Sequence, residues 1–297
     1  MNILLTGASG FLGSTLIKNL DDHHIVSLGR GQASDIVSDL ATEVPRIVPV
    51  DVVIHAAGKA HTVPKTEEEK QLFFDVNLNG TQNLLKSIEE AGKLPRSFIF
   101  ISSVAVYGVD AGLNIPESHP LNAKDPYGIS KIQAEQLIQK WCKEKNVICG
   151  ILRLPLLAGP KPPGNLGAMI NGIKKGYYFN IAGGLAKKSI VLTDDISSII
   201  PALIEKGGIY NLTDGESPSF FNLSEKISNQ LQKPKPFNMP LWIAGLIAAI
   251  GDVVGSKFPL NSNKLKKITS DLTFDDTKAR NVLGWKPKRV LDDFRIE

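Results

Sequence analysis

The 297-residue chain carries 34 Lys and Arg against 30 Asp and Glu, a formal net charge of +4, and 42% of its residues are hydrophobic. This balance is typical of a globular protein with an ample core, and no Lys/Arg run points to nucleic acid as a partner. Cys142 and Cys149 lack a metal-binding or redox spacing, so we expect reduced, structural thiols and no metal site. The first apolar run leads directly into a glycine-rich turn, so no targeting segment is recognisable and a cytoplasmic protein is expected.

Short β-rich runs alternate with helical patterns over the first two-thirds of the chain, which predicts a parallel sheet with helices on both faces. The expected strands span residues 2–5, 25–28, 36–38, 52–55, 98–101 and 147–152, and the expected helices span residues 11–20, 67–91 and 127–145. Thr66 and Glu69 have capping-box spacing at the start of the second helix. Three glycines and three prolines within residues 158–167 break regular structure and indicate a second region.

The first strand leads into a glycine-rich turn that opens a helix, the context that gives a glycine fingerprint its meaning. Gly7 permits the tight turn, Gly10 lets the backbone approach a pyrophosphate, and Gly13 lets the helix pack closely on the sheet. The amides at the helix start, around Phe11 and Leu12, and the positive end of the helix dipole suit phosphates. The turn therefore predicts a dinucleotide site on a Rossmann-type, doubly wound α/β sheet.

The end of the second strand indicates which dinucleotide binds. An acidic residue there would hold the ribose 2′-hydroxyl of NAD, but the sequence ends this strand with Gly29 and Arg30. Because Arg30 can pair with a 2′-phosphate and no carboxylate repels one, we expect NADP(H) to be preferred, with NAD(H) as the alternative.

Tyr127 and Lys131 lie one helical turn apart, so the lysine ammonium can lie near the phenol. A neighbouring cation favours the phenolate, which would lower the pKa of Tyr127 and make it a usable proton donor or acceptor. Ser103 directly follows a strand of the same sheet and is placed to hydrogen-bond the oxygen that Tyr127 serves, while Ser102 closes the strand end or touches the cofactor. This constellation predicts hydride chemistry at a hydroxyl or carbonyl carbon.

One apolar stretch, Met239–Val254, is shorter than the about 20 clean residues that a membrane-spanning helix needs. Pro240, Gly245 and Asp252 also interrupt it. We expect a buried or partly exposed helix, with a membrane-surface helix as the alternative, and no association with a membrane is expected.

Taken together, these motifs resemble the extended short-chain dehydrogenases/reductases, the group of nucleotide-sugar epimerases, dehydratases and reductases. The resemblance covers essentially the whole chain. It rests on Gly7, Gly10 and Gly13, residues 55–58 (HAAG), residues 77–84, Ser103, Tyr127, Lys131, residues 153–155 (RLP), residues 188–194 and residues 283–287 (LGWKP).

The resemblance implies a role for each matching residue. Ser103 would polarise the substrate oxygen, Tyr127 would transfer the proton, and Lys131 would hold the nicotinamide ribose and tune Tyr127. The other residues that it implies for the cofactor site are Asp39, Leu40, Ala56, Ala57, Gly58, Asn77, Ser102 and Pro155. The residues that we assign to the substrate site, besides Ser103, are Lys59, His61, Asn165 and Lys188, with Lys188 facing the substrate diphosphate. Lysine stands at position 188 where the family usually has arginine, and lysine binds phosphate less well as a bidentate donor.

The resemblance also implies a fold class and a function. The fold class is α/β: a Rossmann-type doubly wound parallel sheet with a smaller C-terminal α/β substrate-binding region. The dinucleotide-binding domain would comprise residues 1–157 and 188–212, and the substrate-binding region residues 158–187 and 213–297.

The expected function is reduction of the C4 keto group of a UDP-4-keto-6-deoxy-N-acetylhexosamine in surface-polysaccharide biosynthesis, because a net reductase draws on NADPH. The alternatives are a UDP-sugar 4-epimerase with tightly bound NAD and, more remotely, a non-catalytic NAD(P)-sensing protein. A nucleotide sugar is the expected substrate, and a homodimer is an open alternative to a monomer.

Overall fold

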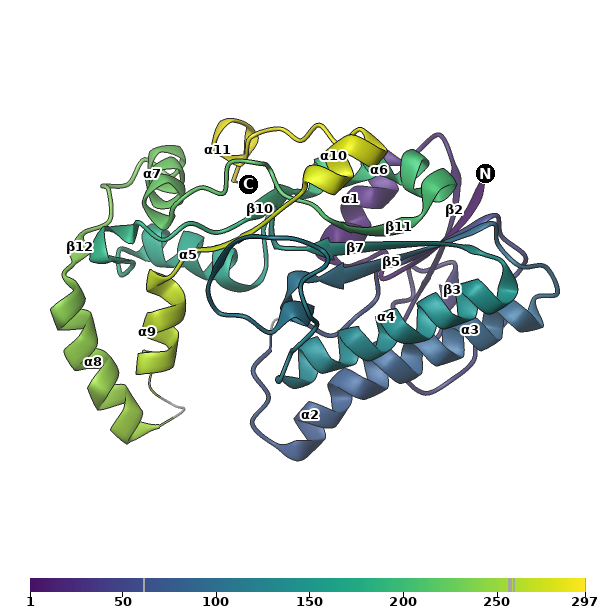
Figure 1. Ribbon diagram of the computed structural model, residues 1–297, viewed down its shortest axis with the longest axis horizontal. Helices are drawn as coiled ribbons and strands as arrows, with labels where there is room; N and C mark the ends of the chain where they lie inside the picture. Colours follow the sequence, from purple (N-terminus) through teal and green to yellow (C-terminus); the bar gives the residue numbers. More distant parts are fainter. Residues whose placement is uncertain (61, 256–257, 259, 297) are drawn as a thin grey trace.

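The computed structural model describes residues 1–60, 62–255, 258 and 260–296. Its centre is a seven-stranded sheet in the order β11-β7-β5-β4-β1-β2-β3, parallel throughout (Figure 1). The strands are β1 (Asn2–Thr6), β2 (His24–Gly29), β3 (Ile36–Val37), β4 (Val52–His55), β5 (Ser97–Ser103), β7 (Ile148–Leu154) and β11 (Gly208–Asn211). The chain winds outward from β1 to β3 and then returns to β4 beside β1, so the switch point of the predicted doubly wound fold lies between β1 and β4.

Helices cover both faces of this sheet (Figure 1). On one face, residues of α1 (Phe11–Asn19), α6 (Thr193–Lys206) and α10 (Thr277–Leu283) pack against the strands in one buried apolar cluster. On the other face, residues of α3 (Gly80–Glu90) and α4 (Pro126–Lys145) form a second cluster with the same strands. The central strands β1, β4, β5 and β7 are therefore buried from both sides, which explains why they read as continuous apolar runs.

The helix predicted over residues 67–91 is divided. It consists of α2 (Glu67–Phe74), a π-helical turn (Asp75–Asn79) and α3. The turn places one extra residue in the helix and buries Asn77. At the start of α2, Thr66 Oγ1 accepts the amide of Glu69 at 3.2 Å, but the Glu69 carboxylate accepts the amide of Lys65, so only half of the predicted capping box forms.

The remaining strands form three two-stranded parallel pairs beside the main sheet. These pairs join β8 (Leu156–Ala158) to β10 (Ile190–Leu192), β9 (Asn180–Ile181) to β12 (Asn238–Met239), and β6 (Gly112–Ile115) to β13 (Leu272–Phe274). The short 3₁₀ helices η2 (Val104–Tyr107) and η3 (Ala182–Gly184) follow β5 and β9. Helices α5 (Gly164–Lys175), α7 (Phe220–Gln230) and α11 (Val290–Asp293) share a third apolar cluster with β8 and β10.

Two helices project from this body at the left of Figure 1, α8 (Leu241–Val254) and α9 (Ser262–Thr269). The predicted apolar stretch therefore forms a helix, and most of its large side chains are exposed. Within the part of the chain that the structure describes, no helix has the length and apolar character needed to cross a bilayer.

Candidate active site

The glycine-rich turn lies at the switch point, against the backbone that follows β4. Gly7 has a φ of +72°, and a Cβ there would lie 2.6 Å from the amide nitrogen of Ala57. A Cβ on Gly13 would collide with the carbonyl of Gly7, so α1 can pack this closely only without one. The amide of Gly10 donates to Gly7 O at 2.9 Å and closes the turn. Steric contact thus requires glycine at Gly7 and Gly13.

The start of α1 suits an anion. Gly10 is its N-cap and supplies no side-chain hydrogen bond, and the first turn holds no acidic residue. The first-turn amides, those of Phe11 and Leu12 among them, are therefore not satisfied by an N-cap side chain, at the positive end of the helix dipole. Backbone amides without a competing carboxylate fit the diphosphate of a dinucleotide.

The carboxyl end of β2 carries a glycine followed by a basic residue. Gly29 ends the strand and Arg30 is exposed immediately after it. The nearby acid Asp35 is bound to Ser27, whose amide and hydroxyl donate to its carboxylate at 2.8 and 2.6 Å and hold the pKa of Asp35 below its usual range. Of the two residues predicted to flank an adenine, Asp39 is partly exposed and Leu40 is buried in the core against Gly80.

Ser103 and Tyr127 form a hydroxyl pair at the carboxyl end of β5. Ser103 is the last residue of the strand, its hydroxyl accepts the amide of Ala105 at 3.2 Å, and its interaction with the phenol of Tyr127 acts to lower the pKa of that phenol. Tyr127 lies in the first turn of α4, which Asp125 caps by accepting the amide of Gly128 at 3.0 Å. The cap fixes where α4 begins, and so fixes the phenol against the strand end.

Lys131 is buried one turn further along α4. Its ammonium donates to the backbone carbonyl of Ile101 at 2.9 Å and lies 4.4 Å from the ring centre of Phe100. Burial lowers the pKa of Lys131 to about 8. The predicted lowering of the Tyr127 pKa by Lys131 is not found: burial raises the pKa of Tyr127, and the interaction with Ser103 opposes that rise only in part.

A buried acid, Glu135, continues this face of α4 and was not predicted from the sequence. It accepts the hydroxyl of Ser102 at 2.5 Å and pairs with the guanidinium of Arg153 at 2.7 Å. Arg153 also donates to the phenol of Tyr107 at 3.2 Å. The side chain of Ser102 is buried and donates within this network. The spacing of Tyr127, Lys131 and Glu135, four residues apart each time, was the available sequence signal.

Asn77 connects the segment after β4 to α4. Its side chain accepts the amide of Lys59 at 2.8 Å, donates to Lys59 O at 3.2 Å and donates to Ser130 Oγ at 2.9 Å. A Cβ on Gly58 would lie 3.0 Å from Asn77 Oδ1 and 3.2 Å from Lys131 Nζ, so the backbone at Gly58 borders Lys131 directly. The structure thus brings Gly58, Lys59 and Asn77 together with Lys131, while the predicted His61 lies outside the described residues.

A hydrogen-bond chain, also missed from the sequence, joins the glycine turn to Asn77. The amide of Ala57 donates to Thr6 Oγ1, which lies 2.7 Å from Nδ1 of the buried His55. His55 Nε2 lies 3.0 Å from Thr81 Oγ1, and Thr81 donates to Asn77 O at 2.7 Å. Burial lowers the pKa of His55 to about 3, so the imidazole stays neutral and connects the two segments without adding charge.

The predicted substrate residues of the second region lie on different elements. Lys188 donates its ammonium to Lys267 O at 2.9 Å, and burial lowers its pKa, so it is bound to α9 rather than free in a loop. Asn165, assigned to the substrate site, is exposed in the first turn of α5. Pro155 lies partly buried between β7 and β8, and Ala56 follows β4.

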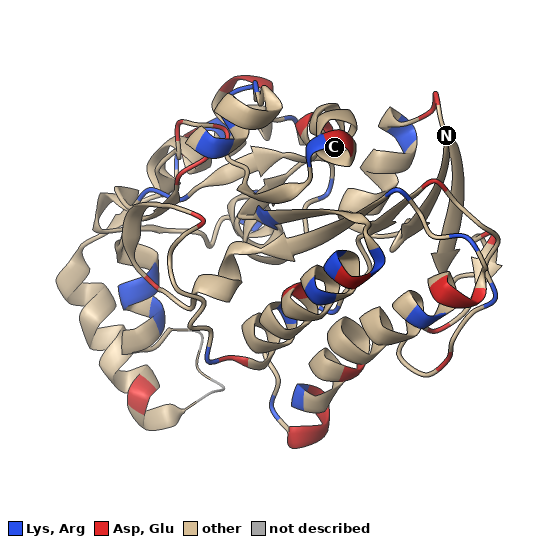
Figure 2. Ribbon diagram, turned by 45° about the vertical axis from the view of Figure 1, so that its right-hand side comes forward, with Lys and Arg blue, Asp and Glu red and all other residues tan. Residues whose placement is uncertain are grey.

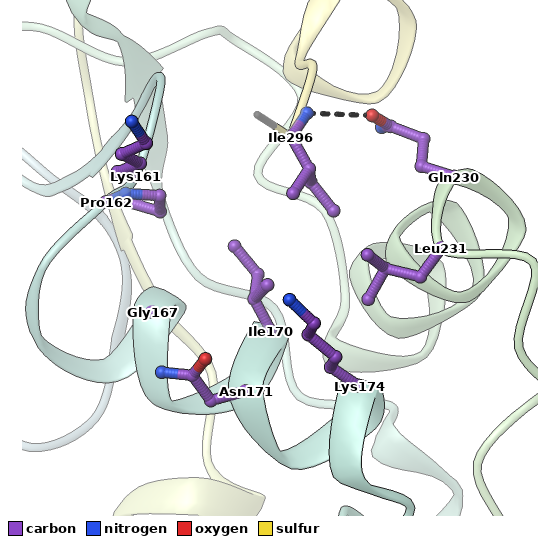
Figure 3. A pocket seen from close by; sticks show the side chains of 9 residues that line it. All are labelled: Lys161, Pro162, Gly167, Ile170, Asn171, Lys174, Gln230, Leu231 and Ile296. Atoms are coloured by element: carbon purple, nitrogen blue, oxygen red, sulfur yellow. Dashed lines mark hydrogen bonds between the residues drawn. The ribbon is translucent and has the colours of Figure 1, made fainter.

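A separate pocket of about 540 Å³ lies between α5, α7 and the C-terminal residues (Figure 3). In that view, Ile170, Lys174, Leu231 and Ile296 point toward one another, and Lys161 lies beside Pro162 at the other side of the pocket. None of the predicted site residues lines it.

The sheet order, the glycine turn at the switch point, and Ser103, Tyr127 and Lys131 at the neighbouring strand end are the arrangement of a short-chain dehydrogenase/reductase. Residues 3–213 match the model of the NAD dependent epimerase/dehydratase family. The chain therefore belongs to this family of NAD(P)-dependent nucleotide-sugar enzymes, as the resemblance predicted.

Relatives agree with this assignment. The chain is 28% identical to a UDP-glucose 4-epimerase of Vibrio cholerae, over 98% of this chain and 92% of the relative. It is also 28% identical to the N-acetyl-α-D-glucosaminyl-diphospho-ditrans,octacis-undecaprenol 4-epimerase of Escherichia coli O157:H7, over 94% of this chain and 89% of that one. Among solved structures, a UDP-glucose 4-epimerase from Thermotoga maritima with UDP-glucose shares the fold, with a TM-score of 0.77 at 21% identity, over 99% of this chain and 96% of that chain.

Proposed function

We propose that the chain reduces the C4 keto group of a UDP-4-keto-6-deoxy-N-acetylhexosamine with NADPH, in the synthesis of a surface polysaccharide. The observation that carries the proposal is the Ser103–Tyr127 hydroxyl pair beside the buried Lys131, together with Arg30 at the end of β2. The pair is suited to a carbonyl or hydroxyl oxygen, and Arg30 favours a cofactor with a 2′-phosphate.

The cofactor would be held along the switch point. The glycine turn and the start of α1 would bind its diphosphate, Arg30 its 2′-phosphate, with Asp39 and Leu40 near the adenine. Ala56, Ala57 and Gly58 would line the channel toward Lys131, which would bind the nicotinamide ribose, and Pro155 would border the nicotinamide. When bound, the nicotinamide supplies the hydride that C4 receives.

The side chains of the strand end would handle the proton. Ser103 would donate a hydrogen bond to the C4 oxygen, and Tyr127 would deliver its phenolic proton to that oxygen as the keto group becomes a hydroxyl. Burial raises the pKa of Tyr127, so the phenol is protonated at neutral pH and ready to act as an acid. Lys131 would stabilise the phenolate that remains.

We also propose that residues 158–187 and 213–297 bind the nucleotide part of the substrate, with Asn165 in the first turn of α5 and Lys188 near its diphosphate. For Lys188 this requires its ammonium to exchange the carbonyl of Lys267 for a phosphate oxygen. Lys59, beside Asn77, would face the sugar.

A second candidate is a 4-epimerase with tightly bound NAD. The similarity to two relatives named as 4-epimerases, over 94% or more of this chain, favours it. One of those relatives is named for a sugar linked to undecaprenol through a diphosphate, so a lipid-linked sugar is a further substrate class for either reaction.

One experiment separates the two candidates. The purified chain is offered a UDP-4-keto-6-deoxy-N-acetylhexosamine with NADPH, and the loss of nicotinamide absorbance is followed. In parallel, UDP-N-acetylglucosamine and UDP-glucose are supplied without added cofactor, and their epimers are measured by chromatography. Stoichiometric NADPH oxidation supports the reductase, whereas interconversion without cofactor and without NADPH oxidation assigns the chain to the epimerases.

A further inference from the structure

Helix α8 reverses the usual arrangement of a surface helix. Its small residues Ala244, Ala248 and Gly251 are buried, and most of its large apolar residues face outward. The exposed fractions are 67% for Trp242, 61% for Leu246, 56% for Ile250 and 89% for Val253. The steps of four, four and three residues between these positions place all four side chains on one stripe of the helix. A single exposed apolar residue needs no explanation, but a continuous stripe marks a surface that something covers.

The orientation of this stripe is fixed by packing. A Cβ on Gly251 would collide with the carbonyl of Leu260, so α8 lies as close as a glycine permits to the segment that leads into α9. The carboxylate of Asp252 accepts the amide of Ser262 at 3.0 Å and its hydroxyl as well, which closes the hairpin at its tip. Turning the large side chains inward would require breaking both of these contacts.

Helix α9, which follows the segment packed on the buried face of α8, carries cations. Helix α9 carries Lys264, Lys266 and Lys267, all exposed, and its eight residues include no acid. Figure 2 shows these cations as blue bands on α9 beside α8, which is uncharged except at its far end, where Asp252 lies. An apolar stripe with tryptophan at one end and a basic neighbour is the composition of a helix that lies in the surface of an anionic membrane.

We propose that α8 and α9 form a docking surface for an anionic phospholipid bilayer, with the stripe Trp242, Leu246, Ile250 and Val253 inserted among the acyl chains and Lys266 of α9 toward the headgroups. At 14 residues α8 is about 21 Å long, too short to span a hydrocarbon core of about 30 Å but sufficient to lie in the interface. The protein is therefore a peripheral binder.

A second copy of the chain fits this surface less well. In a two-fold dimer the same patch serves both subunits, so the α9 cations would occur on both sides of the contact. Within α8 and α9 the one acid is Asp252, and it is already bound to Ser262. Lys267 already pairs with Asp110 at 2.9 Å, so an anionic bilayer would add negative charge chiefly beside Lys266.

The docking surface is connected to the candidate active site. Lys267 of α9 pairs with Asp110 at 2.9 Å, in the loop that follows Ser103 and η2, and Lys188 donates to Lys267 O. Membrane docking would thus hold the loop beside Ser103 near the lipid surface, which suits a substrate or product that is itself attached to lipid.

The fluorescence of Trp242 can report binding of the stripe to vesicles. Of its three tryptophans, Trp141 and Trp285 are buried and Trp242 is exposed on the stripe. The full-length protein is titrated with vesicles of phosphatidylcholine alone or mixed with phosphatidylglycerol, without substrate. Binding is measured by Trp242 fluorescence and by co-sedimentation, at low and high salt. We expect a blue shift of the emission and sedimentation with the phosphatidylglycerol vesicles, both weakened by salt.

Matched variants identify the surface. Leu246→Glu combined with Ile250→Glu should weaken vesicle binding about tenfold or more, and Lys266→Glu should weaken binding to the anionic vesicles selectively. The control Val48→Glu alters an exposed apolar residue of the first domain and should bind as the wild type does. Circular dichroism and NADPH binding verify that each variant is folded.

The proposal is overturned if the wild type fails to bind phosphatidylglycerol vesicles at low salt, or if the double variant binds them equally well. It is also overturned if light scattering shows a dimer that the double variant dissociates while vesicles have no effect, since a second copy would then cover the stripe. None of these measurements depends on turnover, so failure of the proposed reaction leaves them interpretable.

Discussion

The ammonium of Lys131 lies 2.9 Å from the backbone oxygen of Ile101, two residues before Ser103 on the same strand. Helix α4 and strand β5 therefore present a cation and a hydroxyl pair at one sheet end, and the cation is held by backbone rather than by a carboxylate. This arrangement leaves the lysine charge available to whatever occupies the strand end.

The pH dependence of the reaction should follow Lys131. Burial lowers its pKa to about 8, so the ammonium loses its proton as the pH rises through that value, while the raised pKa of Tyr127 keeps the phenol protonated. We expect kcat/KM for reduction to be level below about pH 8 and to fall about tenfold per pH unit above it. Lys131→Arg keeps a cation at high pH, so its residual activity should not fall over this range. A wild-type profile that stays level through about pH 10 would exclude Lys131 as the group whose deprotonation lowers kcat/KM.

Removal of the Tyr127 hydroxyl should abolish most turnover. Tyr127→Phe keeps the ring against Phe73, 6.1 Å away between centres, and loses only the proton donor. We expect kcat to fall by a factor on the order of 10²–10⁴ with NADPH affinity unchanged. Tyr177→Phe, at an exposed tyrosine of the second region, serves as the control and should turn over normally. Near-normal activity of Tyr127→Phe would remove this residue from the mechanism.

Cofactor choice should depend on Arg30. Because the guanidinium stands after β2 where an acid would select NAD, calorimetric titration should give tighter binding of NADPH than of NADH. Arg30→Ala should erase the difference by weakening NADPH binding about tenfold or more, as expected for one charge-assisted contact.

The matched variant Lys140→Ala removes an exposed cation from the outer face of α4 and should leave both affinities as they are. Equal wild-type affinities for the two cofactors would refute the assignment to Arg30.

The alternation of strands and helices predicted the central sheet because each element carries its own pattern. Six of its seven strands were expected within two residues of their observed bounds, and the short β11 was not assigned. The π-helical turn at Asn77 was not visible, since the helical periodicity continues on both sides of it. The hydrogen-bond chain through the neutral His55 was missed because it depends on which strands are neighbours in the sheet. The pairing of Glu135 with Arg153 was missed for the same reason. Lys188 was expected to face the substrate diphosphate, and nothing in its sequence surroundings shows that its ammonium binds a carbonyl of α9.

The buried pair of Glu135 and Arg153 should be important for stability. Glu135→Gln leaves the Arg153 guanidinium buried without its counter-charge, which typically costs about 3–5 kcal/mol of unfolding free energy. Denaturant unfolding should show a lower midpoint and an unchanged slope. Glu205→Gln breaks the exposed pair with Arg96 and should change the midpoint little. If both variants lose the same free energy of unfolding, the buried pair contributes no more to stability than the exposed pair.

The last prediction concerns the substrate diphosphate. Lys188 is bound to the carbonyl of Lys267, and its adjacent residue Lys187 is bound to Asp271 only through its backbone amide. If Lys188 exchanges that carbonyl for a phosphate, Lys188→Ala should raise KM for the UDP-sugar by the equivalent of roughly 1.5–3 kcal/mol, because a charged hydrogen bond is lost. The effect should shrink as salt screens the wild-type interaction, and Lys187→Ala should change KM little. An unchanged KM in Lys188→Ala would mean that the lysine only fastens α9 to the second region, and a lower thermal midpoint of that variant would then be its main consequence.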